Sequence, residues 1–161
     1  MTPKNILMVG NMWRSMNEVA DELNIRRALE GLGHNVISSP QTKDGLDYNW
    51  HEFDLIFEDK PEVDFSLLAK GARPEHIKRL QEFTGKPVFY WMYDLLETEK
   101  KGLTYEGIPD SEMKSDHVQS AILADGYFAK TYEYAALYEQ AGANYYYLTE
   151  DCAPNLHDKL V

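Results

Sequence analysis

Polar side chains stand directly after several short apolar runs of the sequence, the positions at which a parallel β-sheet presents its ligand-binding groups. Asp94 follows the most apolar run, which ends at Tyr93. Partial burial at this position would raise the pKa of the Asp94 carboxyl group and make it a usable general base. An aspartate at the end of a strand also commonly caps the following turn, so both interpretations stay open.

The turn after the first apolar run offers a second set of polar groups. Arg14 can meet a phosphate or carboxylate there, since Ser15 would cap a helix whose N-terminus favours anions, although an ordinary surface arginine fits equally well. The turn lacks the later glycines of dinucleotide-binding loops and the Gly-Lys-Ser/Thr ending of nucleotide-triphosphate loops, so we expect neither NAD nor kinase activity. The predicted binding residues are Gly10, Asn11, Trp13, Arg14, Tyr93, Lys130, Thr131 and Glu150, with Ser38, Ser39, Glu58, Asp59 and Asp151 as further candidates at strand ends.

The cysteine and the histidines form no further catalytic or metal-binding pattern. Cys152 is the sole cysteine, and the two acidic residues before it would raise the pKa of its thiol, so we interpret it as structural. The five histidines show no metal-ligand spacing with one another or with Cys152. We therefore predict no metal ion and no resident cofactor, and a single thiol fits a reducing cytoplasm.

The composition is that of an ordinary globular domain. The chain of 161 residues is 43% hydrophobic and 27% charged, which is enough to build one core. Its formal net charge of −11 at pH 7 repels the phosphate backbone of nucleic acids and anionic membrane surfaces. The apolar runs are strand-sized, so we predict no membrane span, no signal peptide and a single cytoplasmic domain over residues 1–161.

Short apolar runs alternate with helix-like stretches along the chain, which is the order expected of βαβ units. In the first predicted helix, apolar residues recur at i, i+3, i+4 and i+7 from Ile25 to Leu32, and Gly85 and Gly142 suit the ends of two later helices. The predicted strands are 5–9, 34–37, 54–57, 86–93, 126–129 and 144–148, and predicted helices begin near residues 15, 74, 111 and 131. This pattern predicts an α/β fold in which a mostly parallel sheet of about six strands lies between two layers of helices.

Three stretches together resemble a known family. They are residues 10–36, which contain ALEGLGHNV; residues 86–94, KPVFYWMYD; and residues 125–158, which begin DGYFAKTYEYAALYEQAGANYYYL. They resemble the N-terminal, acceptor-side domain of GT-B glycosyltransferases, especially the CgeB-like, glycosyltransferase family 4-like group. The resemblance implies a Rossmann-like domain, a nucleotide-sugar donor as co-substrate, and a second, donor-binding domain that lies outside these residues. Residues 149–151 depart from the Pro-Gly type of turn that is common in this family.

On this resemblance the chain contributes the acceptor side of a sugar-transfer cleft and is incomplete as an enzyme on its own. The implied partners are a glycan or small-molecule acceptor and either a separate donor-binding domain or chain, or a second copy of this chain. Whether the chain itself is an enzyme stays open, and a base at Asp94 is implied for inverting members only, since retaining members need none.

Two other functions fit the sequence. A nucleoside deoxyribosyltransferase also has a compact α/β fold of similar length and a strand that opens with GKPV, as at residues 85–88. Such an enzyme needs a glutamate nucleophile, for which this chain offers Glu75 or Glu82. A non-catalytic binding or assembly module would keep the same fold and use an exposed face for its partner.

Overall fold

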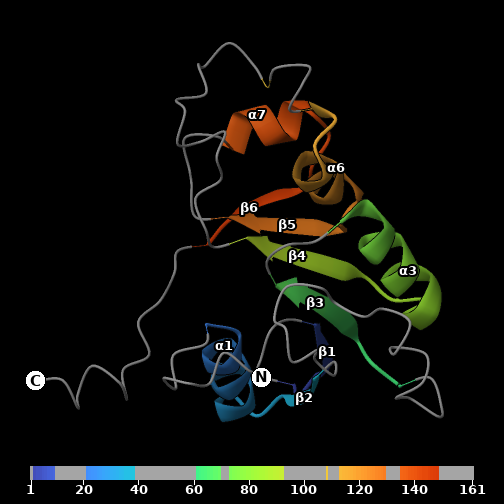
Figure 1. The fold of residues 1–161 in the computed structure, drawn as a ribbon. Coiled ribbons are helices and arrows are strands. Elements are labelled where there is room, and N and C mark those ends of the chain that lie inside the picture. Colours follow the sequence, from blue (N-terminus) through green and yellow to red (C-terminus); the bar gives the residue numbers. More distant parts are fainter. Residues whose placement is uncertain are drawn as a thin grey trace, which may run out of the picture.

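The computed structural model of the chain describes residues 2–9, 21–38, 61–69, 73–92, 108, 113–129 and 135–148. These residues form a six-stranded sheet with helices on both of its faces (Figure 1). The strands are β1 (Asn5–Val9), β2 (Asn35–Ser38), β3 (Phe65–Ala69), β4 (Val88–Met92), β5 (Gly126–Ala129) and β6 (Tyr145–Tyr147), and the helices are α1 (Asp21–Gly31), α3 (Pro74–Thr84), α6 (Asp116–Leu123) and α7 (Ala135–Gln140).

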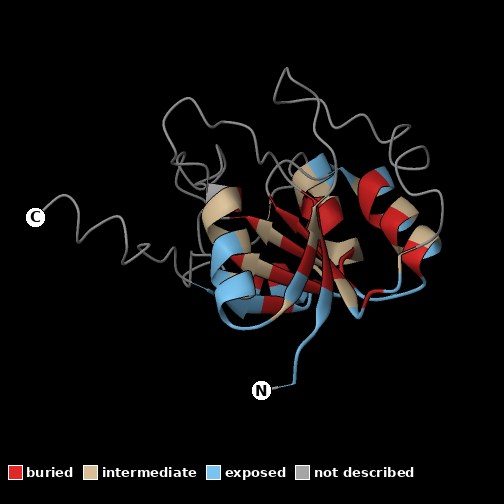
Figure 2. Cartoon of the chain, turned by 90° about the horizontal axis from the view of Figure 1, so that it is seen from below, coloured by how far each residue is buried: buried red, intermediate tan, exposed pale blue. Residues whose placement is uncertain are grey.

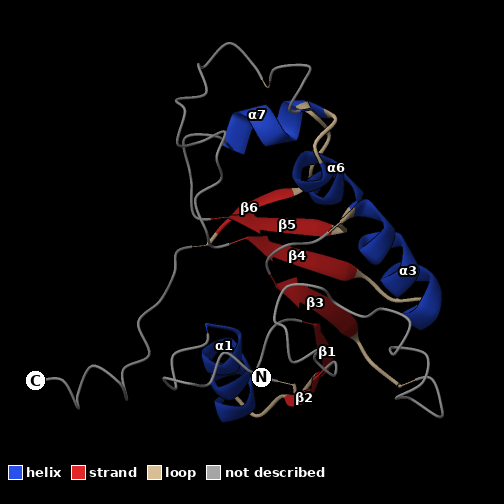
Figure 3. Cartoon of the chain, viewed as in Figure 1, coloured by secondary structure: helices blue, strands red, loops and turns tan. Residues whose placement is uncertain are grey.

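All neighbouring strands of the sheet are parallel, in the order β2-β1-β3-β4-β5-β6. The chain passes from β1 to β2 on one side and then returns to β3 on the other side of β1 (Figure 3). The direction of winding therefore reverses between β1 and β3, and doubly wound sheets bind ligands outside the carboxyl ends of their strands at such a switch point. The predicted α/β fold with a parallel sheet between helices is confirmed.

The third strand differs from its prediction. The place between β1 and β4 is taken by β3, where Leu67 pairs with both Met8 and Phe89. The strand predicted at residues 54–57 lies outside the described residues. Leucine and alanine favour helices over strands, so the composition of β3 carries little strand signal. Pairing on both sides and the burial of four of its five residues outweigh that weak propensity.

The other element boundaries follow from local signals. β1 and β5 coincide with the predicted strands 5–9 and 126–129. The helix predicted from residue 111 begins at Asp116, because the Ser115 side chain caps it by accepting the backbone N–H of Val118. α3 ends as predicted, with Gly85 in the left-handed conformation at a φ of 65°. The apolar spacing predicted for the first helix extends one residue too far, since Leu32 follows the end of α1 and is 63% exposed.

Buried residues gather on the strands and on the helix surfaces that face them (Figure 2). The helices α3, α6 and α7 cover one face of the sheet, whose core contains Leu68 and Ile77. α1 covers part of the other face, where Ile25 and Leu29 pack against Met8. Adjacent strand residues point to opposite faces, so each strand contributes to both layers of the core.

A cluster of tyrosines surrounds one histidine on the face covered by α3, α6 and α7. Tyr90, Tyr127 and Tyr145 occupy paired positions on β4, β5 and β6. The hydroxyl groups of Tyr90, Tyr127 and Tyr138 lie 3.0–3.1 Å from the imidazole nitrogens of His117 on α6. Burial lowers the pKa of His117 to about 4, so the imidazole is neutral at pH 7. We call these five residues the tyrosine cluster; it links α6 and α7 to three strands.

The opposite face carries a row of aromatic rings across β3, β4, β5 and β6. Neighbouring ring centroids lie 5.4 Å apart from Phe65 to Phe89, 5.8 Å from Phe89 to Phe128 and 5.1 Å from Phe128 to Tyr146. Gly126 leaves room for two of these rings, because a Cβ atom there would meet Phe89 Cδ1 at 2.7 Å and Tyr146 Cε2 at 3.2 Å. The aromatic row therefore depends on a residue without a side chain at the start of β5.

Substituting Gly126→Ala is expected to lower the free energy of unfolding by about 1–3 kcal/mol, because the ring of Phe89 must move away from the new methyl group. Urea unfolding measures this loss. In a Phe89→Leu background the same substitution is expected to cost less, since the smaller side chain leaves space for the methyl group. An equal cost in both backgrounds would show that the Phe89 ring is not what excludes a side chain at position 126.

Candidate functional site at the carboxyl edge

The predicted site residues all continue the chain from the carboxyl ends of strands. β1, β4, β5 and β6 end at Val9, Met92, Ala129 and Tyr147, and because these strands are parallel their ends lie at one edge, which we call the carboxyl edge. The predicted residues themselves lie outside the described residues, so their mutual arrangement remains a prediction. They are Gly10, Asn11, Trp13, Arg14, Tyr93, Asp94, Lys130, Thr131 and Glu150.

Ser38 is the predicted candidate that falls within the described residues, as the last residue of β2. Its Oγ accepts a hydrogen bond of 2.8 Å from Nη1 of Arg26, which lies on α1. The Nε of Arg26 donates a second bond of 2.8 Å to Oε1 of Glu30, one turn further along the helix. The guanidinium group of Arg26 is therefore held from two sides at the carboxyl end of β2.

Sequence reasoning missed Arg26. Arg26 and Glu30 are four residues apart, the spacing of an ion pair along a helix, which by itself indicates only a solvated helix face. The contact that connects Arg26 to the carboxyl edge is the one with Ser38, twelve residues away on another element. Nothing in the spacing of these two residues signals that contact, because it depends on how α1 lies against β2.

The position of β3 also changes the charges expected beside the switch point. The residues that follow β3 in the sequence include Lys70 and Arg73, whereas the strand predicted at 54–57 would have placed Glu58 and Asp59 there. Arg73 is exposed, and its backbone N–H, at the N-cap of α3, donates to Nδ1 of His76 over 3.3 Å. Arg73 therefore carries a positive charge at the start of α3, two residues before the Glu75 carboxylate in the first turn of that helix.

His76 is buried behind the start of α3 and is neutral at pH 7. Burial is the largest cause that lowers its pKa to about 4, and the charge of Arg73 acts in the same direction. The hydrogen bond from the Arg73 backbone N–H requires an unprotonated Nδ1, so the neutral form is also the one that caps the helix. We interpret His76 as a structural residue of the α3 start.

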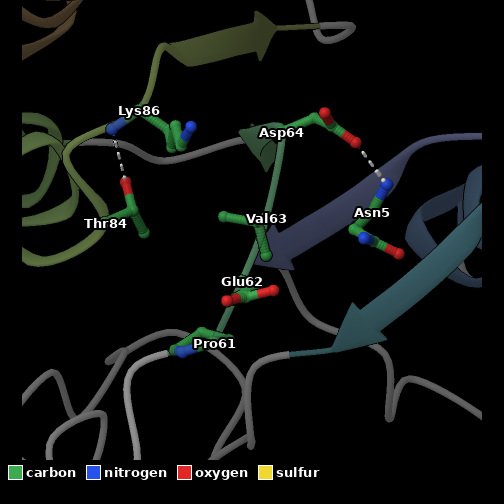
Figure 4. A pocket seen from close by; sticks show the side chains of 7 residues that line it. All are labelled: Asn5, Pro61, Glu62, Val63, Asp64, Thr84 and Lys86. Carbon is green, nitrogen blue, oxygen red and sulfur yellow. Dashed lines mark hydrogen bonds between the residues drawn. The ribbon is translucent and has the colours of Figure 1, made fainter.

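A cavity of about 540 Å³ lies at the opposite, amino edge of the sheet (Figure 4). Its polar groups hold strand starts in place: Asp64 accepts the backbone N–H of Asn5 at 2.8 Å, and the Thr84 hydroxyl accepts that of Lys86 at 3.2 Å. Parallel sheets bind ligands at the other edge, so we interpret this cavity as a structural groove. It is lined by Asn5, Pro61, Glu62, Val63, Asp64, Thr84 and Lys86.

The deoxyribosyltransferase alternative stays a prediction, and its two candidate nucleophiles lie on α3. These residues, Glu75 and Glu82, are both exposed. Glu75 lies in the first turn of α3, two residues after Arg73, and Glu82 lies near the end of that helix.

Two further properties concern the described part of the chain. Within the described ranges, no group of three or more histidine, cysteine, aspartate or glutamate side chains is placed to hold a metal ion. None of the helices described here combines the length and the apolar character needed to cross a lipid bilayer.

The fold defines the class of protein: an α/β domain of the Rossmann-like type, with an all-parallel sheet and helices on both faces. No protein-family model matches the sequence, and no curated protein matches it either. The feature of this domain that bears on its ligand is the carboxyl edge of the sheet, where parallel sheets bind ligands.

Proposed function

We propose that this chain is a glycosyltransferase-like domain that contributes the acceptor side of a sugar-transfer cleft. One observation supports the proposal above the others: the strands that lead into Gly10, Asp94 and Lys130 are parallel and end at the same edge. Each stretch that resembles the GT-B acceptor domain contains elements that build this edge. Residues 10–36 contain α1, residues 86–94 contain β4, and residues 125–158 contain β5, α7 and β6.

In this proposal Asp94 activates the acceptor. When the acceptor hydroxyl attacks the anomeric carbon of the donor sugar, the hydroxyl loses its proton, and a nearby carboxylate can accept it. Asp94 follows Met92 by two residues in the sequence, and the strand that ends at Met92 is firmly anchored, because its Tyr90 is fully buried. The donor is a nucleotide sugar that acts as co-substrate, and the domain needs no resident cofactor.

Titration calorimetry with neutral and acidic monosaccharides and with UDP-, GDP- and TDP-sugars tests the proposal. We expect saturable binding of a saccharide, weakened about tenfold by Asp94→Asn, because the variant loses a charge-assisted hydrogen bond to a sugar hydroxyl. Arg14→Ala is expected to weaken binding in the same direction. Glu62→Gln, which lies at the amino edge, serves as the control and is expected to leave the affinity unchanged.

Two results would count against this function. One is tight binding of a nicotinamide or flavin cofactor, which would assign the carboxyl edge to a different chemistry. The other is saccharide binding that neither Asp94→Asn nor Arg14→Ala changes, since the ligand would then bind away from this edge.

A further inference from the structure

We propose that Arg26 recognises an anionic group, a phosphate or a carboxylate, on the ligand that binds at the carboxyl edge. The inference rests on the proposed function, because it assigns the chemistry of one group on the saccharide that the domain would bind. It concerns the end of β2, next to the strand that leads into Gly10.

The guanidinium group of Arg26 is oriented before any ligand arrives. Its Nε and Nη1 each donate a hydrogen bond of 2.8 Å, to Glu30 and to Ser38 respectively. A guanidinium has five N–H donors, so three of them, one on Nη1 and two on Nη2, take part in no hydrogen bond with the described residues. Donors on these two nitrogens form the fork with which arginine binds two oxygens of a carboxylate or phosphate.

Stability alone does not account for this arrangement. An ion pair along an exposed helix, such as Arg26 with Glu30, and a single hydrogen bond, such as that to Ser38, each stabilise a fold only weakly. Fixing a long arginine side chain costs rotamer entropy of comparable size. The two gains roughly cancel the cost, so the ordered guanidinium adds little to the fold, whereas a binding site gains from having it ordered in advance.

Recognition of an anionic ligand at this edge depends on the cationic groups close to the site. A protein with a net charge of −11 repels anions at a distance, so an anionic ligand needs cationic groups close to its site. Arg26 lies at the end of β2, and Arg73 begins α3 after β3. Glu30 offsets part of the Arg26 charge, so recognition depends on the shape of the fork as well as on charge. A lysine, which lacks the fork, is therefore a poor substitute.

Calorimetry on the intact chain with glucose, galactose and mannose, each as the free sugar, the 6-phosphate and the uronate, tests the inference. We expect the anionic form of the preferred sugar to bind about tenfold more tightly than its neutral form, and Arg26→Gln to remove this preference. Arg26→Lys is expected to restore only part of it. Arg27→Gln, the adjacent exposed arginine of α1, is the matched control and should retain the preference in full.

Comparing the 6-phosphate with the uronate of each sugar shows whether the recognised anionic group is a phosphate or a carboxylate. A preference for the 6-phosphate assigns a phosphate, and a preference for the uronate assigns a carboxylate. Ser38→Ala removes one hydrogen-bond partner of Arg26 but keeps the guanidinium charge and the salt bridge to Glu30. We therefore expect this variant to lose part of the preference for the anionic sugar. Far-ultraviolet circular dichroism checks that each variant keeps its helices.

The assignment of Arg26 is overturned if neutral and anionic sugars bind equally, or if Arg26→Gln and Arg27→Gln have the same effect. In that case saccharide binding that Asp94→Asn still weakens would leave the proposed function intact. If no saccharide binds in any form, both the assignment and the proposed function are overturned together.

Discussion

Replacing Tyr127 by alanine is expected to lower the free energy of unfolding by about 3–5 kcal/mol. The Tyr127 side chain is fully buried, and its ring contacts Tyr90, Tyr138 and Tyr145 at centroid distances of 5.4, 5.0 and 5.6 Å. Its hydroxyl also lies 3.0 Å from Nε2 of His117. Because domains of this size are stable by only about 5–15 kcal/mol, urea unfolding should show a large decrease in the midpoint.

Tyr127→Phe separates packing from hydrogen bonding at the same position. This variant keeps the ring and removes the hydroxyl group, so we expect a loss of about 1 kcal/mol. Tyr146→Phe, on the exposed side of the neighbouring strand, is the matched control and is expected to change stability by less than about 0.5 kcal/mol. If Tyr127→Ala cost no more than Tyr127→Phe, the ring would not be packed as the structure describes.

Lowering the pH from 6.5 to 4 is expected to destabilise the fold through two histidines. The pKa values of His76 and His117 are each lowered from 6.5 to about 4, mainly by burial. The unfolded chain therefore binds protons at these histidines more readily than the folded chain does. Their contribution to stability is complete above pH 6.5 and is lost as the pH falls toward 4, by up to about 3 kcal/mol for the deeply buried His117 and by less for His76.

Urea unfolding at pH 7, 5.5 and 4.5 measures this effect, and a substitution isolates the share of His117. His117→Gln removes the titrating group while keeping a donor and an acceptor for the surrounding hydroxyls, so its stability should fall less steeply with acidification. His34→Gln, one residue before β2, is the control and is expected to change the slope less than His117→Gln does. Identical slopes for all three proteins would contradict a buried, neutral His117.

Much of the fold could be predicted because its signals are local. Ile6 to Val9 form an apolar run of strand length, and Gly85 marks the end of α3 because it takes a left-handed conformation there. β3 could not be predicted in this way, since Leu67 and Leu68 have no strand preference and become a strand by pairing with β1 and β4. Its position in the sheet is a property of the assembled fold.

The candidate site was predictable only as far as strand ends identify it. Parallel strands explain why the residues after β1, β4, β5 and β6 belong to one edge, and the structure confirms that these strands are parallel. Arg26 and the tyrosine cluster were missed because their contacts join separate elements. The Arg26 guanidinium meets Ser38 across the gap between α1 and β2, and His117 meets Tyr138 between α6 and α7.

The tyrosine cluster and the aromatic row together make the alignment of β5 against β4 unambiguous. Tyr90 and Tyr127 carry hydroxyls to the His117 side, whereas Phe89 and Phe128 place plain rings on the other side. Sliding β5 by one position would exchange its two faces, so a hydroxyl would leave its imidazole partner while a phenyl ring took its place. A shift of β5 along β4 therefore costs free energy on both faces of the sheet. As a result, the end of β5, from which the chain continues to Lys130, has one fixed position along the strand direction at the carboxyl edge.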